Sequence, residues 1–172
     1  MLWHLNRCAP GSLCAVTERF GEDLVVDESI VIRAPARQVW RTIVDADARA
    51  GWWEYLDLDA TPGGRFEERW TGDDGTEQIT SGEVVELADA RLLVLSWADD
   101  GWPAATRVEV TLDPGDGGPD DGGPGDGGAT TVRLRHTGWE ALPDGAALAA
   151  AHRGGWLHHL DNLRRCAERA DA

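Results

Sequence analysis

The stretch that decides this fold is residues 146–169, AALAAAHRGGWLHHLDNLRRCAER. At 100° per residue its apolar and ring side chains fall within one stripe that covers about a third of the circumference, which predicts a long helix with one buried face. Gly154 and Gly155 lie inside this helix, where each costs roughly 1 kcal/mol relative to Ala, so we expect another backbone or a bulky ring to pack against them. The stripe consists of Leu148, His152, Trp156, His159, Leu160, Leu163, Cys166 and Ala167.

The rest of the chain supplies an apolar partner for this helix, because it reads almost entirely as strands with a period of two. The predicted strands are residues 24–33, 52–59, 65–70, 77–87, 91–97, 107–112 and 130–137, with short helices over 39–44 and 46–50. Strands and helices are segregated along the chain, so the predicted class is α+β. We expect a curved antiparallel sheet of six to seven strands wrapped around the long C-terminal helix, with two short helices after the first strand.

The length of 172 residues suits one domain, which we place at residues 22–172. Residues 1–21 show no clear period and are predicted to be a flexible N-terminal extension. Residues 113–128 contain only Gly, Asp and Pro. Glycines are expensive to order and the aspartates repel one another, so this segment predicts a flexible loop. A calcium-binding repeat is disfavoured, because no apolar residues lie between the glycines to build a core.

The composition excludes several classes of partner. A net charge of −15 argues against nucleic acid and anionic membranes, which both require a basic face. No run approaches the roughly 18 apolar residues of a membrane span, and Arg7, Pro10 and Gly11 interrupt any signal peptide. The three scattered cysteines suit a reducing compartment, so we expect a cytoplasmic protein without membrane insertion.

A series of short motifs runs in order from about residue 24 to residue 168. They are Ile32-Arg33-Ala34-Pro35 with Val39-Trp40, Trp52-Trp53, Pro62-Gly63-Gly64-Arg65-Phe66, Gly82-Glu83-Val84-Val85-Glu86, Leu95-Ser96-Trp97, Leu134-Arg135-His136-Thr137-Gly138 and His152-Arg153-Gly154-Gly155-Trp156. Together they resemble the helix-grip superfamily of START domains, the major birch-pollen allergen and polyketide cyclases. Within it, the chain is most similar to the group related to the C-terminal domain of the activator of Hsp90 ATPase.

The resemblance implies the helix-grip fold and several activities. Members of the superfamily bind lipids, hormones and polyketides, and some catalyse cyclisation or hydrolysis. Eukaryotic members that activate Hsp90 carry an additional N-terminal domain, and residues 1–21 are too short to form one. Fold alone does not give activity, so the candidate residues must be weighed individually.

Nine Trp against two Phe and one Tyr predict either a Trp-rich core or a cavity lined by rings, and the composition favours neither. The candidates for an aromatic wall are Trp52, Trp53, Trp97 and Trp156, of which two are expected to be pure core.

One predicted strand face carries both rings and a carboxylate. Phe66, Glu68 and Trp70 alternate on residues 65–70 and should face the concave side, unless a bulge inverts the strand and leaves Glu68 in solvent. A buried carboxylate there would act as a general base or orient a polar group of a ligand.

The histidines form the other polar set. His136 shares a strand face with Val132 and Leu134, and His152 and His159 lie on the helix stripe. Their spacing is not diagnostic of zinc, and no HExxH motif or Cys pair supports a metal site, so no metal or other cofactor is predicted. His158 lies off the stripe and should face solvent.

Three functions remain open from the sequence. The first is binding of a small hydrophobic or amphipathic ligand between the sheet and the last helix, by the residues Trp52, Trp53, Phe66, Glu68, Trp70, Trp97, His136, His152 and Trp156. The second is a cyclase- or hydrolase-like enzyme in which Glu68 and either His136 or His152 move protons. The third is a co-chaperone or regulatory protein-interaction module. Non-enzymatic binding is preferred, and a homodimer stays open as an oligomeric state.

Overall fold

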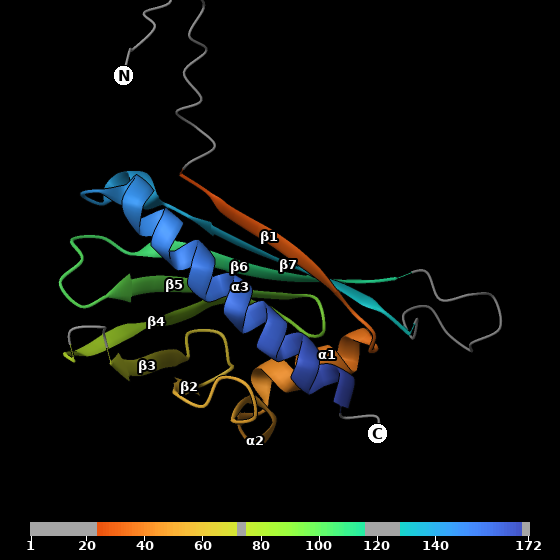
Figure 1. Cartoon of the computed structure of the whole chain (residues 1–172). Coiled ribbons are helices and arrows are strands. Elements are labelled where there is room, and N and C mark those ends of the chain that lie inside the picture. Colours follow the sequence, from red (N-terminus) through yellow and green to blue (C-terminus); the bar gives the residue numbers. More distant parts are fainter. Residues whose placement is uncertain (1–23, 72–74, 116–127, 170–172) are drawn as a thin grey trace, which may run out of the picture.

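The computed structural model of the chain describes residues 24–71, 75–115 and 128–169, and the remaining residues lie outside the description (Figure 1). Seven antiparallel strands form one curved sheet in the order β1-β7-β6-β5-β4-β3-β2. The α+β helix-grip fold is therefore confirmed. The elements are β1 (Val26–Ile32), α1 (Ala36–Val44), α2 (Ala46–Arg49), β2 (Leu56–Leu58), β3 (Arg65–Thr71), β4 (Glu77–Ala88), β5 (Leu92–Asp99), β6 (Thr106–Pro114), β7 (Thr130–Thr137), the 3-10 helix η1 (Trp139–Ala141) and α3 (Gly145–Arg169).

Helix α3 lies across the sheet (Figure 1), and the residues of the predicted stripe are buried or half-buried. Trp156, Leu160, Leu163 and Ala167 are all buried, and they pack with inward residues of the strands in one hydrophobic core. Burial of four such side chains outweighs the modest intrinsic stability of the helix, as is usual for helices in proteins.

The prediction that another backbone or a bulky ring packs against the two helix glycines was wrong. A Cβ atom added at Gly154 or Gly155 meets nothing within 4 Å, so both positions border open space. Gly82 behaves in the opposite way, because its Cβ would lie 1.8 Å from the carbonyl oxygen of Ser96. The register between β4 and β5 shifts between Val84 and Glu86.

Two element boundaries also differ from the prediction. Residues 51–55 form turns, and the strand predicted over 52–59 shrinks to Leu56–Leu58. Strand β6 continues through Asp113 to Pro114, and Gly115 donates to the Ala129 carbonyl, so the first residues of the predicted 113–128 loop belong to the sheet. The rest of that loop, residues 116–127, and the N-terminal extension lie outside the described residues.

A buried arginine holds the turn region in place. The guanidinium of Arg49 is 3% exposed and donates to the carbonyl oxygens of Ile43, Val44, Leu56 and Leu58 at 3.0–3.4 Å. Its planar fork of donors reaches several acceptors at once, which a lysine cannot do. Arg49 thereby joins the end of α1 to β2 and fixes the position of the intervening segment that carries Trp52 and Trp53.

Among the described residues, no helix is long and apolar enough to cross a lipid bilayer.

Candidate functional site

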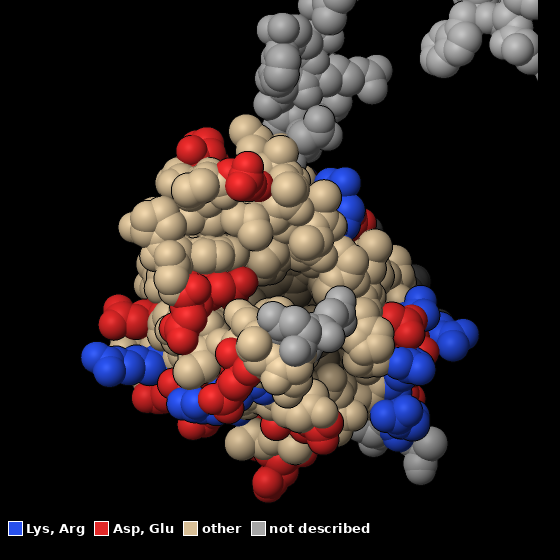
Figure 2. Space-filling model, turned by 60° about the vertical axis from the view of Figure 1, so that its left-hand side comes forward, with Lys and Arg blue, Asp and Glu red and all other residues tan. Residues whose placement is uncertain are grey.

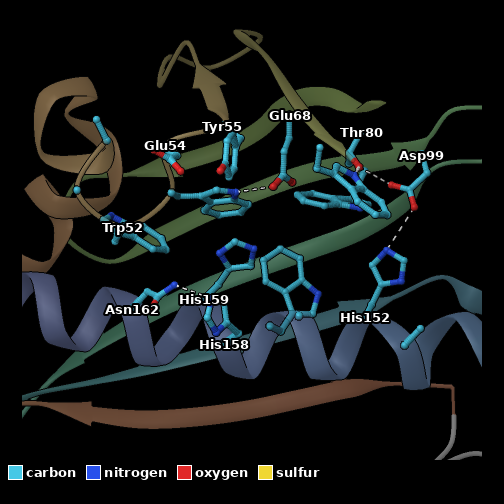
Figure 3. Close-up of a pocket in the computed structure, with 18 of the residues that line it drawn as sticks. Trp52, Glu54, Tyr55, Glu68, Thr80, Asp99, His152, His158, His159 and Asn162 are labelled. Atoms are coloured by element: carbon cyan, nitrogen blue, oxygen red, sulfur yellow. Dashed lines mark hydrogen bonds and ion pairs between the residues drawn. The ribbon is translucent and has the colours of Figure 1, made fainter. Parts of the chain in front are cut away.

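A pocket of about 1000 Å³ lies between α3, the strands β3, β4 and β5, and the turn segment 50–55. The molecule is visibly hollowed on one side (Figure 2). Helix α3 forms one wall and the strands form the opposite wall, with polar side chains projecting from both (Figure 3). Gly155 lies in the helical wall, and its missing side chain leaves room inside the pocket.

Indole rings form a continuous part of the lining. Trp53 and Trp97 contact Trp156 of the helix, with ring centroids 5.8 and 5.0 Å away. Trp52 lies 5.4 Å from Trp53 and donates its indole N–H to the Thr42 carbonyl at 2.8 Å. These four rings pack on one another in the core and all four also line the pocket, so the expectation that two of them are pure core was wrong.

Glu68 is the buried carboxylate of the pocket. Its side chain projects from β3 toward the cavity (Figure 3) and the residue is 8% exposed. Its Oε1 accepts a hydrogen bond of 2.8 Å from the Trp53 indole N–H. Burial raises the pKa of Glu68 because the charged form loses water, although the Trp53 hydrogen bond acts in the opposite direction. Of the two orientations that the sequence left open for Glu68, the structure has the inward one.

Asp99 and His152 form a polar pair across the pocket. Asp99 Oδ1 accepts from the Thr80 hydroxyl at 2.6 Å, and Asp99 Oδ2 lies 3.5 Å from His152 Nε2 (Figure 3). His152 Nδ1 lies 2.9 Å from the Leu148 carbonyl oxygen, which can only accept. Nδ1 is therefore the donor in that contact, and Nε2 is the ring nitrogen that faces the Asp99 carboxylate.

His159 presents a neutral ring to the pocket. It stacks on Trp53 with ring centroids 4.4 Å apart, and its Nδ1 is buried without a hydrogen-bond partner. Burial, with a smaller effect of neighbouring His158, lowers the pKa of His159 to about 4. The ring therefore carries no charge at neutral pH. His158 is exposed, as predicted, yet it also borders the pocket and contacts Asn162 at 3.0 Å.

His136 belongs to the core beneath the pocket. Thr106 gives its only hydroxyl proton to the Trp97 carbonyl, so its oxygen accepts from His136 Nε2 at 2.7 Å. His136 Nδ1 then accepts from the Trp156 indole N–H at 3.0 Å. Both ring nitrogens are occupied, and burial lowers the pKa of His136 to about 3. This imidazole holds the helix to the sheet and has no free nitrogen for proton transfer.

Most of the site residues proposed from the sequence border the pocket. Seven of the nine candidates do so, whereas Phe66 and His136 lie in the core outside the lining. His159 and Asp99 were missed as site residues. His159 carried a usable signal, its place on the helix stripe, but Asp99 looked like an ordinary turn residue. Within the described ranges, no group of three His, Cys, Asp or Glu side chains is arranged to hold a metal ion.

A family model agrees with this architecture. Residues 33–168 match the family described as Activator of Hsp90 ATPase homolog 1-like protein. No curated protein matches the chain significantly.

Solved structures of the same fold come from several bacteria. Protein MLL2253 from Mesorhizobium loti is 20% identical, with a TM-score of 0.64 over 86% of this chain and 99% of its own. CalU16 from Micromonospora echinospora is 22% identical, with a TM-score of 0.61 over 83% and 75%. The Aha1 dimer from Colwellia psychrerythraea is 17% identical, with a TM-score of 0.62 over 84% and 97%. At these identities the likeness establishes the fold alone.

Proposed function

The chain belongs to the Activator of Hsp90 ATPase homolog 1-like family, and on that premise we propose that it binds a small amphipathic molecule in the pocket under α3. The observation that carries the proposal is the pocket itself, which has about 1000 Å³ of space between the sheet and the helix. Sites for small molecules are typically concave, apolar and about 300–1000 Å³ in volume, with few polar groups.

The character of the lining supports an amphipathic ligand. Indole rings supply broad apolar surface, and burying it against a ligand is worth roughly 25 cal/mol per Å². Glu68, Asp99 and His152 supply hydrogen-bonding groups on the walls. A purely apolar ligand would leave unmet the hydrogen-bonding capacity that these groups do not already use within the protein, at a cost of about 1–3 kcal/mol for each unpaired group.

The enzymatic alternative now rests on fewer groups. His136 is hydrogen-bonded at both ring nitrogens and does not line the pocket. Only Glu68 and His152 of the proposed proton-transfer residues remain at the cavity. Binding is therefore the better-supported function.

The two helix glycines offer a matched test. Gly155 lines the pocket and Gly154 does not, while both have open space for a side chain. We would measure binding of the uncharged dye Nile red by its fluorescence in the wild-type protein and in the Gly155→Phe and Gly154→Phe variants. Each substitution should leave helix stability unchanged or raise it by a few tenths of a kcal/mol.

We expect Gly155→Phe to weaken dye binding at least tenfold, because the ring projects into the space that the dye needs. Gly154→Phe should bind as the wild type does. Equal affinities for all three proteins, or no binding by the wild type, would contradict the proposal. If the dye binds as expected, native mass spectrometry of protein purified from its own host would identify a co-purifying molecule.

A further inference from the structure

One carboxylate in the pocket wall lacks a cationic partner in the described part of the chain. Glu68 accepts one hydrogen bond from Trp53 and forms no ion pair within 4 Å with the described residues, and His152 acts on it electrostatically only from farther away. Asp99, in contrast, has His152 at 3.5 Å. Burial of a carboxylate is unfavourable unless an opposite charge or several hydrogen bonds compensate for the lost water. A positively charged ligand group would supply that compensation.

Indole rings line the same part of the pocket as this carboxylate. Trp53 donates to it, and the Trp97 ring lies 6.3 Å from the Trp53 ring. Trp70 lies two residues further along the same strand face, is 40% exposed, and borders the pocket. The faces of indole rings are negative and attract cations within about 6 Å, an effect that strengthens away from water. Carboxylate and rings thus select for the same sign of charge.

The cationic side chains of the lining belong to another part of the pocket. Arg165 follows Trp156 by nine residues, which is about 13 Å along the helix axis, and it pairs with Asp161 at 3.4 Å. Arg169 lies one turn further on. His159, which stacks on Trp53, is neutral. Among the described lining residues, His152 acts on Glu68 from farther away but is paired with Asp99, so none of them forms a direct ion pair with Glu68.

From this arrangement, and resting on the proposed function, we propose that the ligand is an organic cation, with an ammonium group seated between Glu68 and the indole rings and an apolar body in the remaining space. Protonated amines and quaternary ammonium groups share this chemistry. An anionic ligand would be repelled by the Glu68 carboxylate at this end of the pocket.

Three naphthalene probes, of which the first two share one shape, separate charge from apolar contact. They are (1-naphthylmethyl)trimethylammonium, its uncharged carbon isostere 1-neopentylnaphthalene, and the anion 1-naphthylacetate. Affinities would be measured by isothermal titration calorimetry at pH 7 and 150 mM salt, where screening suppresses the effect of the net charge of −15. The proteins are the full chain, Glu68→Gln and Glu67→Gln.

The two substitutions remove the same charge from the same strand. Glu67 projects to the other face, where it is half exposed and pairs with Arg69, so Glu67→Gln controls for net charge. Glutamine at position 68 keeps an acceptor for the Trp53 indole. Circular dichroism would verify that both variants are folded.

We expect the wild type and Glu67→Gln to bind the cation at least tenfold more tightly than its uncharged isostere, and the anion most weakly. Glu68→Gln should lose most of this preference and keep its affinity for the isostere. If the wild type binds the cation and the isostere equally, or if both variants reduce cation affinity alike, the cation assignment is overturned while ligand binding stands. If none of the three probes binds the folded wild type, both the proposed function and this assignment fail.

Discussion

Replacing Trp156 by phenylalanine removes one N–H donor and keeps an aromatic ring in the same place. In the native protein this indole donates to Nδ1 of His136, whose ring is fully buried. The other ring nitrogen is already committed to Thr106 at 2.7 Å, so the imidazole cannot turn toward a new partner. The variant therefore leaves a buried acceptor unpaired.

The expected loss of stability follows from these contacts. An unsatisfied buried acceptor costs about 1–3 kcal/mol, and the smaller ring loses roughly 1 kcal/mol of packing. We expect Trp156→Phe to lower the free energy of unfolding by about 2–4 kcal/mol. For a domain of this size the melting temperature should fall by at least about 4 °C.

Urea unfolding followed by far-UV circular dichroism would measure this loss without relying on tryptophan fluorescence. A double-mutant cycle with His136→Leu isolates the hydrogen bond, because the double variant leaves neither the indole donor nor the imidazole acceptor unpaired. We expect the double variant to be at least about 1 kcal/mol more stable than the sum of the single effects predicts. Additive effects within about 0.5 kcal/mol would refute a stabilising hydrogen bond between Trp156 and His136.

Acidification should destabilise the protein between about pH 6.5 and pH 4. In the folded state the pKa values of His136 and His159 are lowered to about 3 and about 4, so the unfolded state binds protons at a higher pH than the folded state does. Each histidine contributes a slope of up to about 1.4 kcal/mol per pH unit in urea titrations, and a slope unchanged by His159→Gln would count against its burial. Glu68→Gln should be more stable than the wild type at pH 7, because the raised pKa of Glu68 means that the charged carboxylate opposes folding. This gain should vanish as the pH falls toward about 4.5, the pKa of the carboxyl group in the unfolded chain. A loss of stability at pH 7 would contradict this prediction. Arg49→Lys should cost at least about 2 kcal/mol in the same assay because it leaves buried carbonyl groups unpaired, whereas the exposed control Arg37→Lys should stay within about 0.5 kcal/mol.

The alternation of apolar and polar residues was enough to predict the antiparallel sheet and the long helix. These periods are local properties of the backbone, so they can be read without knowing what lies opposite. The helix stripe correctly placed Trp156, Leu160 and Leu163 inside. The strand pattern placed Glu68 inside for the same reason.

What only the tertiary structure decided is which inward side chains meet the core and which meet open space. His136 and His152 were both predicted from the sequence to be ligand-binding residues. In the structure His136 is buried and hydrogen-bonded to Trp156, whereas His152 borders the pocket. Gly155 was expected to be packed and instead leaves room in the pocket wall. Periodicity gives the direction of a side chain, whereas the distance between α3 and β3–β5, which opens the pocket, is set by the packing of elements far apart in the chain.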